Sequence, residues 1–186
     1  MAITRLGGAN AITGTLPAAN IDSTSLGNVD VGKVLQVVQG TSSTQFSQSS
    51  PTDGTIYYPS SNKLSATITP SSTSSKIIIK YVSTMRVNHG TTTDAGVALA
   101  VKETISGGLT TEIKPQANAY ASGFYVSNTG SGSNYRLRLT EIVFRTPSTT
   151  SEITYEVGVF GYNSTLIYLN ASSSRGEIVL MEIAGW

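Results

Sequence analysis

The residues of this sequence that could do chemistry are one histidine and a few carboxylates. His89 lies among Asn, Gly and Thr residues, and the chain has no second histidine and no cysteine to complete a metal site with it. A serine nucleophile would need His and Asp partners, and the Gly-x-Ser-x-Gly motif is absent. Glu152 and Glu156 fall on the exposed face of one expected strand, with no further sign of a glycosidase. We therefore expect a non-enzymatic protein with no catalytic residue, no metal site and no cofactor.

Two arginines raise the question of nucleic-acid binding. Arg136 and Arg138 follow Tyr135, and an aromatic residue beside basic ones is one way to bind single strands. The formal net charge is only +1, however, so the chain has no field that would attract a polyanion. We interpret these arginines as a solvated strand face and expect no nucleic-acid partner.

Composition places the chain among folded β proteins. Hydrophobic residues make up 39% and charged residues 12%, about half the usual charged share. Disorder is unexpected, because disordered chains combine high net charge with few β-branched residues. The N-terminus lacks the apolar run of a signal peptide, and no stretch approaches the ~20 apolar residues of a membrane helix. We expect a protein made in a cytoplasm, without a signal peptide and without membrane insertion.

The clearest structural pattern is the alternation of residues 76–87, which predicts a long strand with one face in a core. The other face carries Lys76, Lys80, Thr84 and Arg86, with Ile78 and Val82 between them, and is expected to be largely exposed. The inward side chains are Ile77, Ile79, Tyr81, Met85 and Val87.

Similar patterns elsewhere, joined by polar turns and without any helical period, predict an all-β fold. We expect an antiparallel β-sandwich over residues 32–186, jelly-roll-like rather than immunoglobulin-like, since the strands are long and unevenly spaced. Residues 41–61 are expected to be a loop, anchored by Phe46 and by residues 56–58. The other expected strands span residues 33–39, 63–69, 95–103, 111–114, 120–127, 135–145, 152–162, 166–169 and 178–183.

Three of these strands have unusual faces. Residues 33–39 are apolar on both sides, which favours a central or covered strand. In residues 135–145 the apolar phase slips, which predicts a β-bulge or a strand that passes between the sheets. The last strand, within residues 177–183, is also apolar on both sides. Its outer face is either covered within the chain or forms a subunit interface around a symmetry axis.

Residues 1–31 differ from the rest, because single apolar residues are spaced among Gly, Ala, Asn, Thr and Ser. Such a segment alone cannot bury enough apolar area to offset its ordering entropy. It is either a floppy tail or an extended arm whose apolar residues enter pockets on other subunits, and the regular spacing favours the arm. The candidate assembly residues are Ile3, Leu6, Ile12, Leu16, Ile21 and Leu26.

Two segments resemble proteins of tailed bacteriophages. ANAITGTLPAANI (residues 9–21) is similar to a segment that recurs in tail-fibre and other virion structural proteins, and GEIVLMEIA (residues 176–184) resembles the closing strand of small phage appendage domains. The resemblance covers about a fifth of the chain and carries no catalytic motif. It implies a trimeric β-structured virion component, made in the host cytoplasm and attached through its N-terminus. A typical fibre has a long repetitive shaft, whereas here the sandwich begins near Gly32, which favours compact roles.

Two functions fit that resemblance. The first is a short tail-fibre or appendage subunit, a homotrimer attached to other virion proteins through residues 1–31 and contacting the host surface. Tyr57, Tyr58 and Tyr120, in or beside polar loops, are the candidate ligand-facing residues for a surface glycan. The second is a capsid decoration, or cement, protein whose arm clamps neighbouring shell subunits.

Overall fold

A computed structural model describes residues 33–89, 94–114, 123–126 and 134–185. All of them belong to the unit Gly32–Trp186. The arm residues and Tyr120 lie outside the described residues. Where the structure describes the chain it consists of strands and one short 3₁₀ helix, η3 (Ala171–Ser173), between the last two strands.

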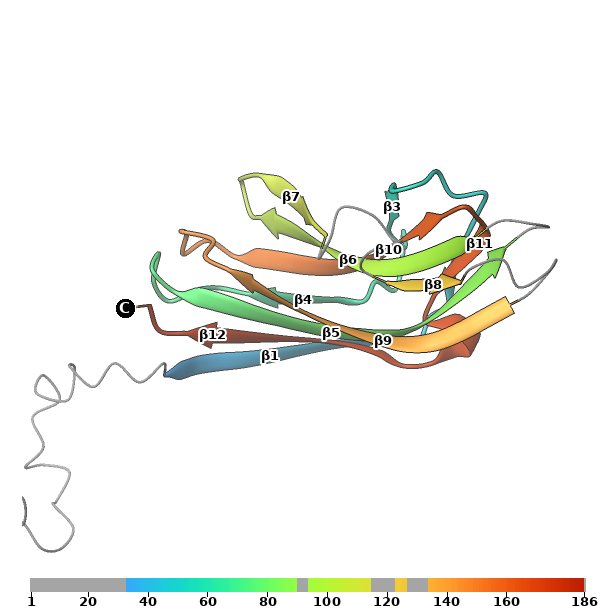
Figure 1. The fold of residues 1–186 in the computed structure, drawn as a ribbon. Coiled ribbons are helices and arrows are strands. Elements are labelled where there is room, and N and C mark those ends of the chain that lie inside the picture. The colour runs from blue at the N-terminus through green and yellow to red at the C-terminus, as the bar shows by residue number, and fades with distance from the viewer. Residues whose placement is uncertain (1–32, 90–93, 115–122, 127–133, 186) are drawn as a thin grey trace, which may run out of the picture. The chain divides into compact units, whose positions relative to one another are not determined.

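The strands form two antiparallel sheets that face each other as a sandwich (Figure 1). The fold class is therefore confirmed as an antiparallel, jelly-roll-like β-sandwich. The first sheet has the order β1 (Val34–Ser42), β12 (Gly176–Ile183), β5 (Lys76–His89), β11 (Ser164–Leu169) and β2 (Phe46–Ser49), with β9 (Asn134–Arg145) on the other side of β5. The second sheet has the order β3 (Ile56–Tyr57), β10 (Ile153–Tyr162), β6 (Ala95–Ile105) and β7 (Thr110–Ile113), with β4 (Ser65–Ile68) on β10 and β8 (Phe124–Val126) on β6.

The core lies between the sheets and is built by the alternation that the sequence predicts. Strand β5 runs the length of the first sheet and pairs with β12, β11 and β9. Its predicted inward residues are all buried. They face the apolar side chains of β6 and β10 in one continuous cluster. The central members of this cluster are Ile77, Ile79, Tyr81, Met85, Val87, Val97, Leu99, Val101, Tyr155, Val157 and Val159.

Strand β9 corrects one expectation. It pairs with β5 from Arg145↔Ile77 to Asn134↔Asn88 without a register shift, so the predicted bulge or crossing between sheets is wrong. The apparent phase slip has another cause. Glu141 occupies an inward position, while Ile142 and Phe144 point outward in the same phase as the preceding polar residues.

Strand β1 corrects a second expectation. It ends the first sheet instead of lying in its middle, and its outer side chains are exposed, so the prediction of a central or covered strand is wrong for the described chain. The predicted loop of residues 41–61 also contains β2 and β3. Each is short, with one apolar residue, Phe46 or Ile56, packed into a cluster. Tertiary packing stabilises them despite a weak local pattern.

Candidate functional site

The solvent-facing side of the first sheet carries an apolar row across four strands. Val37 of β1 pairs with Met181 of β12, Met181 pairs with Ile78 of β5, and Ile78 pairs with Phe144 of β9. All four side chains point away from the core, because their neighbours along each strand are the inward ones. We call this part of the face the apolar end. Its other members are Val34, Leu35, Val179, Ile183 and Ile142.

The apolar end is unusually exposed for a soluble surface. The exposed fractions are 50% for Val34, 40% for Leu35, 58% for Val37, 54% for Ile142 and 70% for Phe144. Together these five side chains expose apolar area on the order of 500 Å², which is in the range of the largest patch on a typical monomer, a patch that is often functional. The described chain thus leaves the outward side chains of the last strand only half-buried.

Two of the candidate ligand-facing tyrosines, Tyr57 and Tyr58, are described, and they lie at the second sheet. The Tyr57 hydroxyl accepts a hydrogen bond from the Thr52 backbone N–H at 2.9 Å. The centroid of the Tyr58 ring lies 4.0 Å from the Lys102 ammonium nitrogen. The same ring packs against Gly158 so closely that a Cβ atom at residue 158 would clash with it. Burial, reinforced by nearby carboxylates, raises the pKa of Tyr58. Ligand contact by Tyr57 and Tyr58, and by Tyr120, stays a prediction.

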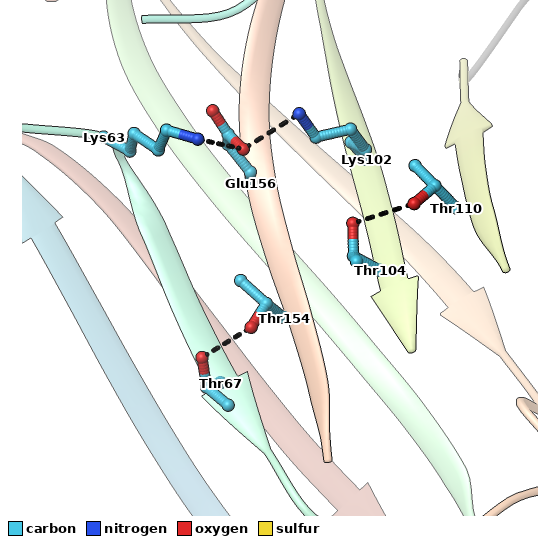
Figure 2. Close-up of polar contacts among 7 residues, drawn as sticks. All are labelled: Lys63, Thr67, Lys102, Thr104, Thr110, Thr154 and Glu156. Carbon is cyan, nitrogen blue, oxygen red and sulfur yellow. Dashed lines mark hydrogen bonds and ion pairs between the residues drawn. The ribbon is translucent and has the colours of Figure 1, made fainter. Parts of the chain in front are cut away.

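Glu156 is not the exposed carboxylate that its place in the sequence indicates. It points outward from the second sheet, because its neighbours Tyr155 and Val157 lie in the core. Its Oε2 lies 3.1 Å from the Lys63 ammonium and 3.0 Å from the Lys102 ammonium. Figure 2 shows the carboxylate between these two lysines. The two lysines cover the carboxylate, whose residue is only 4% exposed. A cross-strand hydroxyl pair, Thr67 with Thr154 at 2.9 Å, extends the same face (Figure 2). Such pairs stabilise a sheet, and here they hold β4 against β10.

Two further carboxylates are buried between the sheets and were not singled out from the sequence. Glu103 receives two bonds from the Arg145 guanidinium, at 2.8 and 3.2 Å, and one from the Tyr155 hydroxyl at 2.7 Å. Burial raises its pKa, but these hydrogen bonds and the Arg145 charge lower it overall. The signal was present, since period two places Glu103 in line with inward Leu99 and Val101.

Glu182 is likewise a buried carboxylate held by several hydrogen bonds, but none of the described donors is a cation. Its Oε1 accepts bonds from the Ser71 backbone N–H, the Ser71 hydroxyl and the Ser75 hydroxyl at 2.6–2.7 Å, and its Oε2 accepts one from Gln36 at 2.6 Å. Burial would raise its pKa, but the hydrogen bonds lower it to about 2. Both carboxylates therefore hold strands and turns together.

Within the described ranges, no cluster of three or more His, Asp or Glu residues could hold a metal ion. Nor is any helix in that part of the chain long and apolar enough to cross a membrane. The site candidates that remain are surfaces of the sandwich.

Comparisons with known proteins give structural neighbours only. No protein-family model matches the sequence, and no curated protein matches it. The CBM22-1 xylan-binding domain of Paenibacillus barcinonensis Xyn10C is 11% identical, with a TM-score of 0.32 over 83% of this chain and 97% of that one. A chain of the T13 IBDV viral particle is 13% identical, with a TM-score of 0.33 over 84% of this chain. A chain of the infectious bursal disease virus Gx strain has the same identity and TM-score over 83% of this chain. The match covers only 37% of each viral chain.

Proposed function

We propose that this protein is a non-enzymatic structural subunit of a tailed-phage virion, a short tail-fibre or appendage subunit. It assembles as a homotrimer, is attached to other virion proteins through residues 1–31, and presents its β-sandwich to the host surface. The observation that carries the proposal is the apolar end of the first sheet. Patches of this size are often functional, and this one is made of large apolar side chains, which suits contact between protein subunits.

The occupant that we assign to the apolar end is a second copy of the same chain. The row from Val37 to Phe144 reaches both edges of this part of the sheet, so equivalent faces can meet around a symmetry axis. The resemblance of residues 9–21 to trimeric virion proteins supports the same assembly. The six spaced apolar residues of the arm supply the separate attachment to the particle.

A charge placed in the apolar end is expected to separate the subunits. In Phe144→Asp a carboxylate would be buried in each subunit contact, so the full-length chain should run as a monomer, while the wild type runs as a trimer. The measurement is mass by light scattering during size-exclusion chromatography. Thr140→Asp is the matched control, because Thr140 is an exposed outward residue of the same strand beyond the apolar row. A monomeric wild type, or a Phe144→Asp variant that stays trimeric, contradicts the assigned interface.

Removal of residues 2–31 tests the attachment. The truncated chain should remain a folded sandwich, because the described residues of both hydrophobic clusters all lie within residues 38–180. It should no longer join the particle, since the apolar residues that enter neighbouring subunits are gone. Incorporation into particles is measured by immunoblot of purified virions, with circular dichroism as the folding control. Incorporation at the wild-type level would show that the arm is not the attachment.

Copy number separates this proposal from the capsid decoration role, which the early start of the sandwich also suits. Quantitative mass spectrometry of purified particles should find a few dozen copies or fewer for a tail component. Hundreds of copies per particle would instead assign the protein to the shell.

A further inference from the structure

The outer face of the first sheet changes character toward the other end of β5 and β9. There Arg86 of β5 pairs directly with Arg136 of β9, and Arg138 of β9 pairs with Thr84. All of these side chains point outward, since Met85 and Val87 point into the core. Like charges directly opposite each other destabilise a sheet, so folding alone does not account for the arrangement. We call this region the arginine end.

The guanidinium of Arg86 is held in a fixed position. Its Nε donates to the Asn88 Oδ1 at 3.1 Å and to the Asn134 Oδ1 at 3.2 Å, and its Nη2 donates to the Asn134 Oδ1 at 2.7 Å. It also lies over the Tyr168 ring, 4.9 Å from the centroid. None of the hydrogen bonds between Arg86 and other described residues uses Nη1, so this side of the guanidinium can face a ligand. A side chain ordered in advance loses little entropy when it binds a ligand.

A hollow lies beside this guanidinium. It has a volume of about 460 Å³ and is lined by Arg86, Asn134, Tyr135 and Arg136. The volume lies in the range of small-ligand sites, ~300–1,000 Å³. In the described part of the chain, none of the four ion pairs involves Arg86, Arg136 or Arg138. Two guanidinium groups, those of Arg86 and Arg136, therefore line a concave, polar surface, and neither forms an ion pair with a described carboxylate. Arg138 lies beside them on the same strand face, with one N–H on the Arg175 carbonyl.

We propose that the arginine end binds an acidic saccharide, whose carboxylate or other anionic group sits between Arg86 and Arg136. The planar guanidinium fork matches a carboxylate or sulfate with two parallel hydrogen bonds. The surrounding groups suit sugar hydroxyls and a sugar ring face: Ser47, Ser49, Thr84, Asn88, Asn134 and Tyr168. The inference gives a ligand class to the host-surface contact proposed above, and in that sense rests on it.

The site and the proposed subunit interface do not overlap. Arg136 is eight residues from Phe144 along β9, which is roughly 27 Å in an extended strand. Subunits joined through the apolar end would therefore leave each arginine end open. A trimer would also present three such sites, so weak single contacts to a repetitive polysaccharide would add by multivalency.

A saccharide fits this surface better than single-stranded nucleic acid. Nucleic-acid affinity grows with the number of phosphates that are neutralised, and a net charge of +1 offers few beyond these three arginines. No row of aromatic side chains continues from Tyr168 along the described face, where the row instead ends in Ser47.

Binding by the purified full-length chain tests the inference. Isothermal titration calorimetry should detect oligogalacturonate at low salt but not neutral dextran. Dextran sulfate separates two sources of the anionic group: equal or tighter binding assigns the site to sulfated sugars, and weaker binding assigns it to uronic acids. Absence of binding to both acidic probes overturns the proposal, and so does oligo(dT) binding tighter than that of either.

Variants locate the binding. Arg136→Gln is expected to weaken binding of the acidic probe at least tenfold, because it removes one of the two guanidinium groups proposed to hold the anion. Arg136 is exposed, so its loss should not disturb the fold. Lys63→Gln is the matched control, since it removes one positive charge from the second sheet, away from both the hollow and the apolar end, while Glu156 keeps Lys102 as its partner. It should change the Kd less than twofold. Equal losses in the two variants would mean general attraction of charge and would overturn the site. Trimer mass and particle incorporation should be normal in Arg136→Gln, so failure here is distinct from failure of the assembly proposal.

Discussion

Replacement of Arg145 by methionine is expected to lower the free energy of unfolding by about 2 to 3 kcal/mol, less than the ~3 to 5 kcal/mol of a fully buried ion pair, because the Arg145 side chain is 33% exposed. Glu103 is only 2% exposed, and without the guanidinium its carboxylate keeps just the Tyr155 hydroxyl as a side-chain partner. Because β6 and β9 belong to different sheets, the pair also joins the two layers. Urea unfolding monitored by circular dichroism measures the loss. A loss below about 1 kcal/mol, as for an exposed ion pair, would contradict this prediction.

The pH dependence of this variant has a definite sign. In the wild type the pKa of Glu103 is lowered, so its contribution is present at neutral pH and is lost as the pH falls through the carboxyl range. In Arg145→Met burial is no longer offset by the guanidinium, and the pKa of Glu103 should rise above its ordinary value. The variant should then lose stability relative to the wild type as the pH rises from about 4 to about 7.

The triple variant Glu103→Met, Arg145→Met and Tyr155→Phe is the control for this prediction. It removes both charges and the hydroxyl together, and replacing a whole buried polar group by apolar side chains is often neutral for stability. It should recover most of the loss. If it is as unstable as Arg145→Met, the defect lies in packing rather than in the unpaired carboxylate.

Much of the fold could be predicted from the sequence, because period two is a local property. The inward residues of β5 follow from the alternation of Ile77, Ile79 and Tyr81 alone. Alternation cannot identify the core-facing side of a strand whose two faces are both apolar. Strand β1 has such faces, so its sequence predicts a covered strand, although β1 lies at the edge of the first sheet. In β9, Ile142 and Phe144 are apolar but point outward. A sequence pattern that assigns apolar residues to the core therefore predicts a change of phase that the strand does not have.

The candidate sites could be predicted less well, because they depend on register between distant strands. Arg86 and Arg136 are 50 positions apart, and only the pairing of β5 with β9 places them opposite each other. The same holds for the row from Val37 to Phe144, which needs three strand pairings. The outward positions of Arg86 and Arg136 could be predicted from the sequence, whereas the strand pairing that makes them neighbours could not.

Replacement of Glu182 by glutamine is expected to lower the free energy of unfolding by about 3 kcal/mol at neutral pH. The folded-state pKa is about 2 against an ordinary value of 4.5, and about 2.5 pKa units correspond to roughly that energy. The amide keeps one acceptor oxygen, but its NH₂ group would face either the Ser71 and Ser75 donors or the Gln36 amide. Either orientation leaves a donor without an acceptor in the interior.

The pH profile identifies the carboxylate as the cause. A lowered pKa means that Glu182 stabilises the fold fully above about pH 5 and loses this contribution as the pH falls toward 2. The difference between wild type and Glu182→Gln in urea unfolding should therefore be largest at pH 7 and shrink steadily below pH 5. Glu177→Gln is the matched control, because Glu177 lies on the outer face of the same strand in an exposed pair with Arg175, where the loss should stay below about 1 kcal/mol. A difference that is independent of pH would instead point to altered packing around Ser71 and Ser75.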